Sequence, residues 1–209
     1  MILVLARLRY YWARESGLGE SLRMTLPIVI STLSWTVMQF IDRMYLVWYS
    51  SEALAASLPA AVVHFSTLCF FFGVASYTNT FVAQYHGAGR DDRVGPSVWQ
   101  GIHLGILATP LFLLTIPLAP WLFSLSGHGP VLAGLETTYY QILVVASPAM
   151  VISAAQQSFF TGRGDSNTVA LIDVVAAIIN IVLDYAWIFG HWGFPEGGIA
   201  GAAWATVVA

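Results

Sequence analysis

The sequence predicts an all-α protein that crosses a lipid bilayer several times. Hydrophobic residues make up 57% of its 209 residues and charged residues only 9%, whereas a soluble domain carries about 25% charged residues. Six apolar segments alternate with short loops rich in Gly and Pro, and they cover residues 24–48, 53–85, 97–123, 136–160, 167–190 and 198–209. About 20 apolar residues suffice to span a bilayer as a helix. We therefore expect a polytopic domain over residues 24–209, with five complete spans and an incomplete sixth.

Residues 1–23 are expected to form an N-terminal segment at the cytoplasmic face of the membrane, because arginines favour that face. Arginines precede the first apolar segment and recur in the loops after the second and fourth segments, at Arg7, Arg9, Arg14, Arg23, Arg90, Arg93 and Arg163. The alternate loops contain none. The pattern predicts a multi-pass protein of the cell membrane with a cytoplasmic N-terminus.

Charge and cysteine content exclude several other classes of protein. The chain has no lysine, eight arginines and eleven acidic residues, so no basic patch indicates a nucleic-acid partner. Cys69 is the single cysteine, which rules out a disulfide within the chain. We therefore expect the lipid bilayer, and not a nucleic acid, to be the partner of this protein.

The fifth apolar segment carries polar residues that a bilayer helix seldom tolerates. Asp173, Asn180 and Asp184 follow one another at offsets i, i+7 and i+11, which places them on one stripe of a helix. A carboxylate in the hydrocarbon region costs roughly 2.5–3.5 kcal/mol on insertion scales. The stripe therefore predicts a polar cavity, as a transporter requires.

Helical rise places a second carboxylate at the same depth. Asp42 lies about 27 Å along the first segment from its inner end, and Asp184 about 26 Å along the fifth. Asn180 lies about 20 Å along the fifth, and Thr206 lies about 12–14 Å from the outer end of the sixth. Hard oxygen ligands at one depth suit Na⁺ or a shared proton.

Purely structural roles remain open for the same residues. Asn180 could instead form a hydrogen bond between two helices. The hydroxyl of Thr206 could donate to the backbone carbonyl four residues earlier in its own helix. The carboxylate of Asp42 could simply be neutralised by Arg43. Asp173 lies about 9 Å from the inner end of its segment. At that depth it either attracts a cationic substrate or, like Gln157, forms part of a cavity wall or a helix contact.

Several short motifs in order resemble the multidrug and toxic compound extrusion (MATE) family of cation-coupled antiporters. Leu26-Pro27 opens the first segment, fifteen residues before Asp42, and Phe81-Val-Ala-Gln84 with Gly87-Ala-Gly89 closes the second. The remaining motifs are Gly162-Arg-Gly-Asp165, Asn180-Ile-Val-Leu-Asp184 and Gly201-Ala-Ala-Trp-Ala-Thr206. The resemblance runs through nearly all of residues 24–209.

This resemblance implies the N-terminal six-helix lobe of a twelve-helix, two-lobe transporter, with its last helix truncated and the C-terminal lobe as its missing partner. Family members are secondary transporters, not enzymes. They exchange Na⁺ or H⁺, without a further cofactor, for small organic compounds that are often cationic or aromatic. The cation-binding positions then correspond to Asp42, Asn180, Asp184 and Thr206, with the carbonyl of Ala202. Pro27 matches a proline where the first helix bends, beside the cavity of Asp173 and Gln157.

Three other functions compete with this hypothesis. A lipid-linked oligosaccharide flippase of the same superfamily needs arginines for pyrophosphate, and the apolar segments have almost none. An intramembrane aspartyl protease would use the Gly-x-Gly-Asp pattern ending at Asp165 together with Asp184, but these lie about 28 Å apart along a helix. A membrane anchor without a transport role does not explain several polar residues at one depth.

Overall fold

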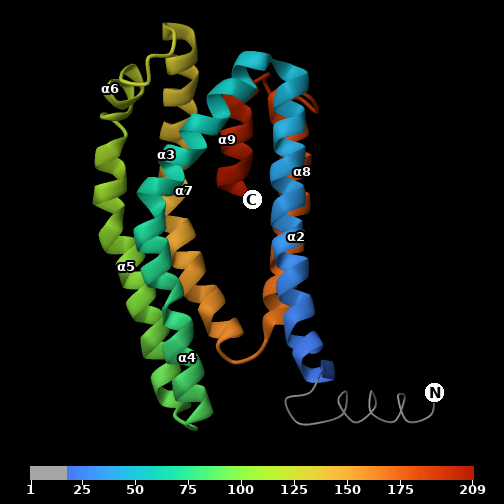
Figure 1. Ribbon diagram of the computed structural model, residues 1–209, viewed down its shortest axis with the longest axis vertical. Helices are drawn as coiled ribbons and strands as arrows, with labels where there is room; N and C mark the ends of the chain where they lie inside the picture. Colours follow the sequence, from blue (N-terminus) through green and yellow to red (C-terminus); the bar gives the residue numbers. More distant parts are fainter. Residues whose placement is uncertain (1–17) are drawn as a thin grey trace, which may run out of the picture.

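The computed structural model of the chain describes residues 18–209, and these residues form helices joined by short loops, without a β-strand (Figure 1). The expected N-terminal segment of residues 1–23 lies mostly outside the described residues. The helices are α2 (Leu18–Tyr49), α3 (Ser51–Ser76), α4 (Thr78–Gly87), α5 (Val94–Thr115), α6 (Ala119–Ser124), α7 (Pro130–Thr161), α8 (Ser166–Phe189) and α9 (Gly198–Val208), with a 3₁₀ turn at Asp91–Arg93 before α5.

Two of the predicted segments are each divided into two helices. The second divides at Tyr77, which keeps helical dihedral angles (φ −63°, ψ −17°) and donates to the carbonyl of Gly73 at 3.1 Å, so α3 bends directly into α4. The third divides between Thr115 and Ala119. Pro117 lies in that break and has no backbone N–H to donate. The sequence did not predict these divisions, although Ser51–Gly87 together still forms one stretch long and apolar enough to span a bilayer.

Four other prolines lie inside helices without ending them. Pro27 is in α2, Pro59 in α3, Pro110 in α5 and Pro148 in α7. Membrane helices tolerate such prolines because neighbouring groups satisfy the freed backbone carbonyls.

The helices form two groups with α9 between them. The first group contains α3, α5 and α7, in which α7 packs against both of the others. The second group is the pair α2 and α8, and α9 contacts both α7 and α8 (Figure 1). Segments distant in the sequence, near residues 42 and 184, are thereby brought side by side.

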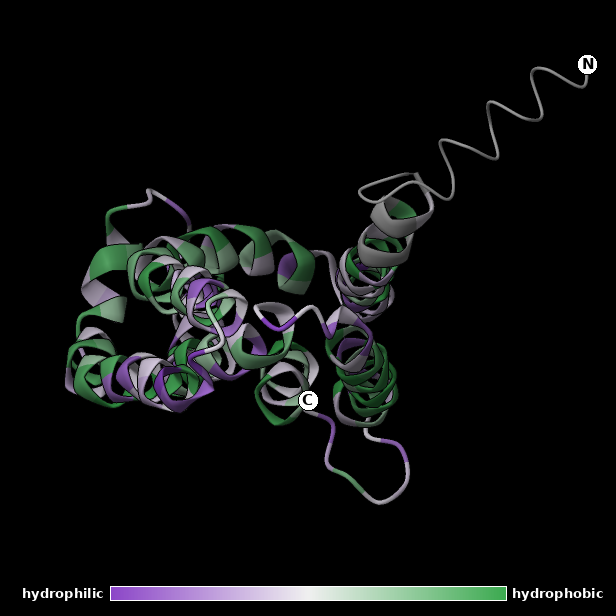
Figure 2. Ribbon diagram, turned by 90° about the horizontal axis from the view of Figure 1, so that it is seen from below, coloured by the Kyte–Doolittle hydropathy of each residue, from purple (hydrophilic) through white to green (hydrophobic). Residues whose placement is uncertain are grey.

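Helix length and hydropathy support a multi-pass membrane protein. Four helical stretches of the described chain are long and apolar enough to span a bilayer: Ser51–Gly87, Asp91–Thr115, Pro130–Thr161 and Ser166–Phe189. Hydrophobic residues extend along the long helices, and hydrophilic residues gather in loops and at helix ends (Figure 2). Large apolar side chains such as Phe40, Phe65 and Leu107 are exposed, as expected for surfaces that contact lipid.

A candidate cation site between α2, α8 and α9

Helix α8 begins and ends with well-defined caps, and these fix the register of its polar stripe. Asp165 is the N-cap, and its carboxylate accepts from the backbone N–H of Thr168 at 3.3 Å and from its hydroxyl at 2.6 Å. Gly190 ends the helix in the left-handed conformation, with φ of 70°. Between these caps, Asn180 and Asp184 are completely buried, with 1% and 0% exposure. The predicted stripe faces the interior of the protein.

Asp42 of α2 faces this stripe. It is 4% exposed and lies close enough to Asp184 for the two charges to interact. One oxygen of each carboxylate, Oδ1 in both cases, is buried and has no hydrogen-bond partner within residues 18–209. Burying carboxylate oxygens without partners is costly. A bound cation or proton between α2 and α8 would remove that cost.

Asn180 connects the carboxylate pair to α9. With the amide oriented to satisfy its neighbours, its nitrogen donates to Asp184 Oδ2 at 3.0 Å and its oxygen accepts from the backbone N–H of Thr206 at 3.3 Å. The Thr206 hydroxyl itself donates to the carbonyl of Ala202 at 3.1 Å. Thr206 therefore reaches the site through its backbone, and its role and that of Ala202 as cation ligands stay predictions.

Backbone packing holds α9 against the end of α8. The N–H of Gly197 donates to the carbonyl of Trp187 at 2.8 Å. A Cβ atom on Gly201 would lie only 2.4 Å from that same carbonyl oxygen. Only glycine allows α9 to lie this close to the Trp187 carbonyl of α8. This close packing sets the distance between Asn180 and the backbone of Thr206.

Arg43 lies next to the carboxylate pair. Its Nε is 3.8 Å from Asp42 Oδ2, and its Nη1 donates to the hydroxyl of Ser57 at 3.3 Å. Ser57 is fully buried in α3. The pairing of Asp42 with Arg43, which the sequence analysis gave as the structural role of Asp42, is thus observed.

Tyr139 is a site residue that sequence reasoning missed. It lies on α7 with 3% exposure, in the neighbourhood of Asp42, Arg43 and Asp184. A tyrosine inside an apolar segment gives no signal of its own. Only the packing of α7 against the other helices brings it to the site.

The predicted cavity residues form a second polar cluster on the same helices. Asp173 of α8 accepts hydrogen bonds from the Ser31 hydroxyl of α2 and, at 3.4 Å, from the Gln157 amide of α7. Pro27 is buried one helical turn before Ser31. The structure therefore brings Asp173 and Gln157 together with Ser31, whereas the role of Asp173, Gln157 and Pro27 in lining a substrate cavity stays a prediction.

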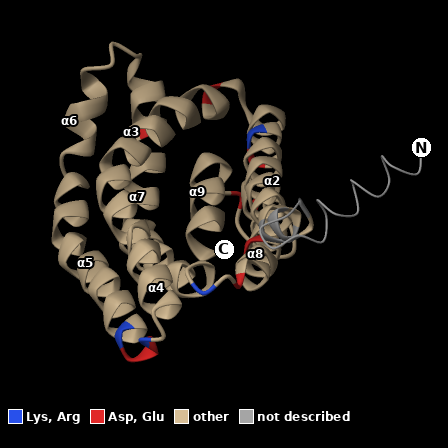
Figure 3. Ribbon diagram, turned by 60° about the horizontal axis from the view of Figure 1, so that its bottom comes forward, with Lys and Arg blue, Asp and Glu red and all other residues tan. Residues whose placement is uncertain are grey.

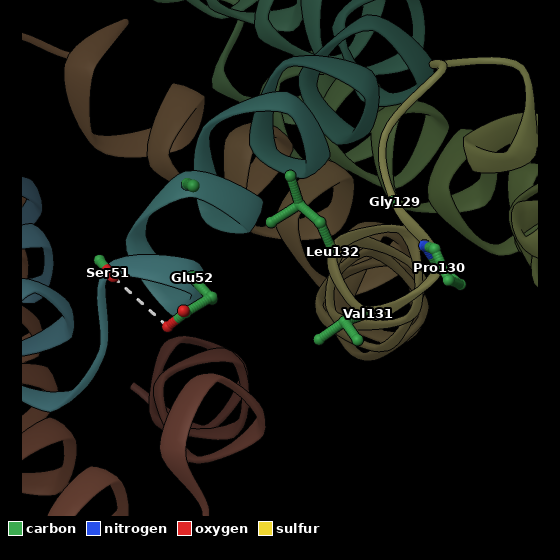
Figure 4. Close-up of a pocket in the computed structure, with 7 residues that line it drawn as sticks. Ser51, Glu52, Gly129, Pro130, Val131 and Leu132 are labelled. Carbon is green, nitrogen blue, oxygen red and sulfur yellow. Dashed lines mark hydrogen bonds between the residues drawn. The ribbon is translucent and has the colours of Figure 1, made fainter.

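A separate hollow of 440 Å³ opens where α3 and α7 begin (Figure 4). It is lined by Ser51, Glu52, Ala55, Gly129, Pro130, Val131 and Leu132. None of the residues of the two polar clusters lines it. The hollow is thus distinct from the candidate site.

Comparison with curated proteins identifies relatives along most of the chain. The probable multidrug resistance protein NorM of Listeria monocytogenes is 31% identical over 191 residues, which cover 90% of this chain and 41% of the relative. The multidrug resistance protein PmpM of Pseudomonas aeruginosa is 30% identical, covering 92% and 40%. The chain therefore spans about two-fifths of the length of these relatives.

Solved structures agree on the fold. A transporter of the MOP superfamily from Pyrococcus furiosus matches with a TM-score of 0.79 at 24% identity, over 90% of this chain and 41% of its own. A MATE structure in the straight conformation matches with a TM-score of 0.77 at 25% identity, over the same shares. The predicted fold class, one lobe of a MATE-type membrane protein, is confirmed. The MatE family model matches residues 27–186, which include Asp42, Asn180 and Asp184, and the chain belongs to this family.

Proposed function

We propose that the chain forms the N-terminal lobe of a cation-coupled antiporter that exports organic compounds by alternating access. The observation that carries this proposal is the pair Asp42 and Asp184, two buried carboxylates from different helices that each keep one oxygen without a partner in the described chain. Such an arrangement binds a cation or proton strongly when buried and releases it when a helix moves. This is what coupling requires, since an ion drives transport only through different affinities for two states.

The coupling cation enters from outside and binds between Asp42 and Asp184, with Asn180 holding the second carboxylate. Its binding favours the inward-facing state, in which the ion is released, and the vacated lobe then takes up a substrate from the cytoplasm. The direction rests on the positive-inside pattern. Arg90, Arg93 and Arg163 lie in connections at one end of the bundle (Figure 3), which we assign to the cytoplasm.

The substrate is a small organic cation or aromatic compound. Asp173 supports this because it is only half-buried and places a negative charge between α2, α7 and α8. Relatives named as multidrug resistance proteins support a broad range of such compounds.

No observation favours the two competing activities. Helices α3 to α9 contain no arginine, and Arg43 of α2 is paired with Asp42, so within α3 to α9 and beside the candidate site a pyrophosphate group finds no free guanidinium. Asp165 caps the exposed start of α8, whereas Asp184 is buried near its other end. The two carboxylates cannot share a proton, as a protease dyad must.

The deciding experiment is dye efflux from cells that express the full-length protein. Wild type is compared with Asp184→Asn, and Asp92→Asn serves as the control because Asp92 lies in an exposed turn. A sodium pulse and an outside-acid pulse are applied separately. Efflux by wild type and by Asp92→Asn should respond to one of the two ions, and that response identifies the coupling ion. Efflux by Asp184→Asn should respond to neither ion, although equal amounts of all three proteins are present in the membrane. Wild-type efflux by Asp184→Asn would overturn the site, and no efflux under either gradient would direct attention to a lipid-linked substrate.

A further inference from the structure

Arg43 supplies a fixed positive charge inside the candidate site. Its guanidinium is held from two sides, by Asp42 on its own helix at 3.8 Å and by the buried hydroxyl of Ser57 on α3 at 3.3 Å. The side chain is only 24% exposed, and its Nε has no hydrogen-bond partner among the described residues. The guanidinium therefore lies beside Asp42, and most of the side chain is buried.

We infer that Arg43 restricts the site to one monovalent cation and excludes divalent cations. The inference rests on the proposed function and concerns the selectivity of the same site. Asp42 and Asp184 contribute two negative charges, Arg43 contributes one positive charge, and Asn180 contributes none. No third acidic side chain joins them in the described part of the chain. One Na⁺ or one proton makes the site neutral.

A divalent cation would leave an excess positive charge next to Asp42 and Asp184, which are 4% and 0% exposed. An uncompensated buried charge is costly, so the site rejects it. Without Arg43, the same two carboxylates and the amide oxygen would offer a doubly negative set of hard oxygen ligands. Such ligands suit Mg²⁺, Ca²⁺ or Mn²⁺. Arg43 is thus a selectivity residue that need not contact the ion.

The test uses Mn²⁺ alone as the probe and measures its binding to the purified full-length protein from the magnetic-resonance signal of the free ion. Arg43→Gln removes the charge and keeps a donor for Ser57, whereas Arg43→Lys keeps the charge. Arg90→Gln is the control, because Arg90 lies in an exposed turn and contacts Tyr85. We expect Arg43→Gln to bind one Mn²⁺ at least about tenfold more tightly than wild type, Arg43→Lys and Arg90→Gln, because removal of a nearby like charge strengthens cation binding.

The double variant Arg43→Gln with Asp184→Asn should lose the additional Mn²⁺ binding of Arg43→Gln. That loss would show that the Mn²⁺ binds at Asp42 and Asp184. Arg43→Met provides a second charge-free variant in case Arg43→Gln is poorly folded. The inference is overturned if wild type binds Mn²⁺ as tightly as both charge-free variants, or if neither variant gains a site that depends on Asp184.

These results are separable from those on transport. Ion-driven efflux by wild type without a gain of Mn²⁺ would overturn the role of Arg43 and leave the antiporter standing. A gain of Mn²⁺ without any ion-driven efflux would support the selectivity role and overturn the antiporter.

Discussion

Asn180 donates to the carboxylate of Asp184 across one turn of α8, with 3.0 Å between the amide nitrogen and Oδ2. Because the amide oxygen of Asn180 also accepts from the backbone of α9, the carboxylate and that helix are mechanically connected. Under the proposed function, we expect cation binding at Asp184 to affect the position of α9, and a shift of α9 to alter the candidate site.

Asn180→Ala removes this connection and leaves a buried oxygen of Asp184 without its donor. An unsatisfied buried group costs about 1–3 kcal/mol, so we expect a lower melting temperature and a changed cation concentration for half-maximal efflux. Thermal unfolding of the purified protein and ion-dependent efflux measure the two effects. Asn167→Ala, at an exposed position near the start of the same helix, is the control. Identical behaviour of the two variants would remove Asn180 from the site.

Gly201→Ala tests the close approach of α9 to α8. The new Cβ would lie 2.4 Å from the Trp187 carbonyl, a backbone atom that cannot move aside without shifting a helix. We expect a destabilisation of about 1–3 kcal/mol together with weaker ion dependence of efflux. Gly134→Ala in α7 is the matched control, because no atom lies within 4 Å of its added Cβ, and alanine favours a helix by up to about 1 kcal/mol. Equal stability of the Gly201→Ala and Gly134→Ala variants would contradict the close packing of α9 against α8 at Gly201.

Glu136 and His128 form a pair that the sequence did not suggest. Glu136 is completely buried in α7, and its Oε1 lies 2.6 Å from Nδ1 of His128 in the preceding loop. His128→Ala leaves a buried carboxylate without this partner, which costs roughly 1–3 kcal/mol. The double variant with Glu136→Gln should recover most of that loss, because the remaining amide is neutral. The melting temperatures of the two single variants and the double variant are compared. If the two losses of stability simply add in the double variant, Glu136 and His128 are not coupled.

Asp173→Asn tests whether the second polar cluster recognises charge. Charge-assisted hydrogen bonds and ion pairs in partly buried places contribute about 1.5–3 kcal/mol, so the half-maximal concentration for a cationic dye should rise at least about tenfold. A neutral aromatic dye should be affected little, and Asp92→Asn should change neither dye. An equal loss for both dyes would indicate that Asp173 only holds α2, α7 and α8 together through Ser31 and Gln157.

Much of the fold and part of the site follow from the sequence because they depend on local periodicity. The i, i+7, i+11 spacing alone places Asp173, Asn180 and Asp184 on one stripe, and helical rise places Asp42 at the depth of Asp184. These inferences need only the dimensions of a helix and a bilayer. The structure agrees with them where it buries Asn180 and Asp184 against α2 and α9.

The rest depends on how helices pack, which no local pattern records. Tyr139 and Ser57 are ordinary residues of apolar segments until α7 and α3 bring them to Asp42 and Arg43. The bend at Tyr77 has no proline to mark it, so the sequence does not locate it. Pro117 did mark the break after α5, but prolines at Pro59 and Pro110 leave their helices intact, and composition alone does not separate these cases.

The adjacency of Asp42 and Arg43 also bears on how the protein is made. Helix α2 leaves the ribosome long before α8, so Asp42 must enter the membrane before Asp184 and Asn180 exist. An aspartate inside an inserting helix costs up to about 2.5–3.5 kcal/mol, the value at the helix centre. A neighbouring arginine of the same helix provides a counter-charge from the first moment of insertion. Arg43, for which we infer a role in ion selectivity, is thus also expected to stabilise α2 in lipid until Asp184 and Asn180 have been synthesised.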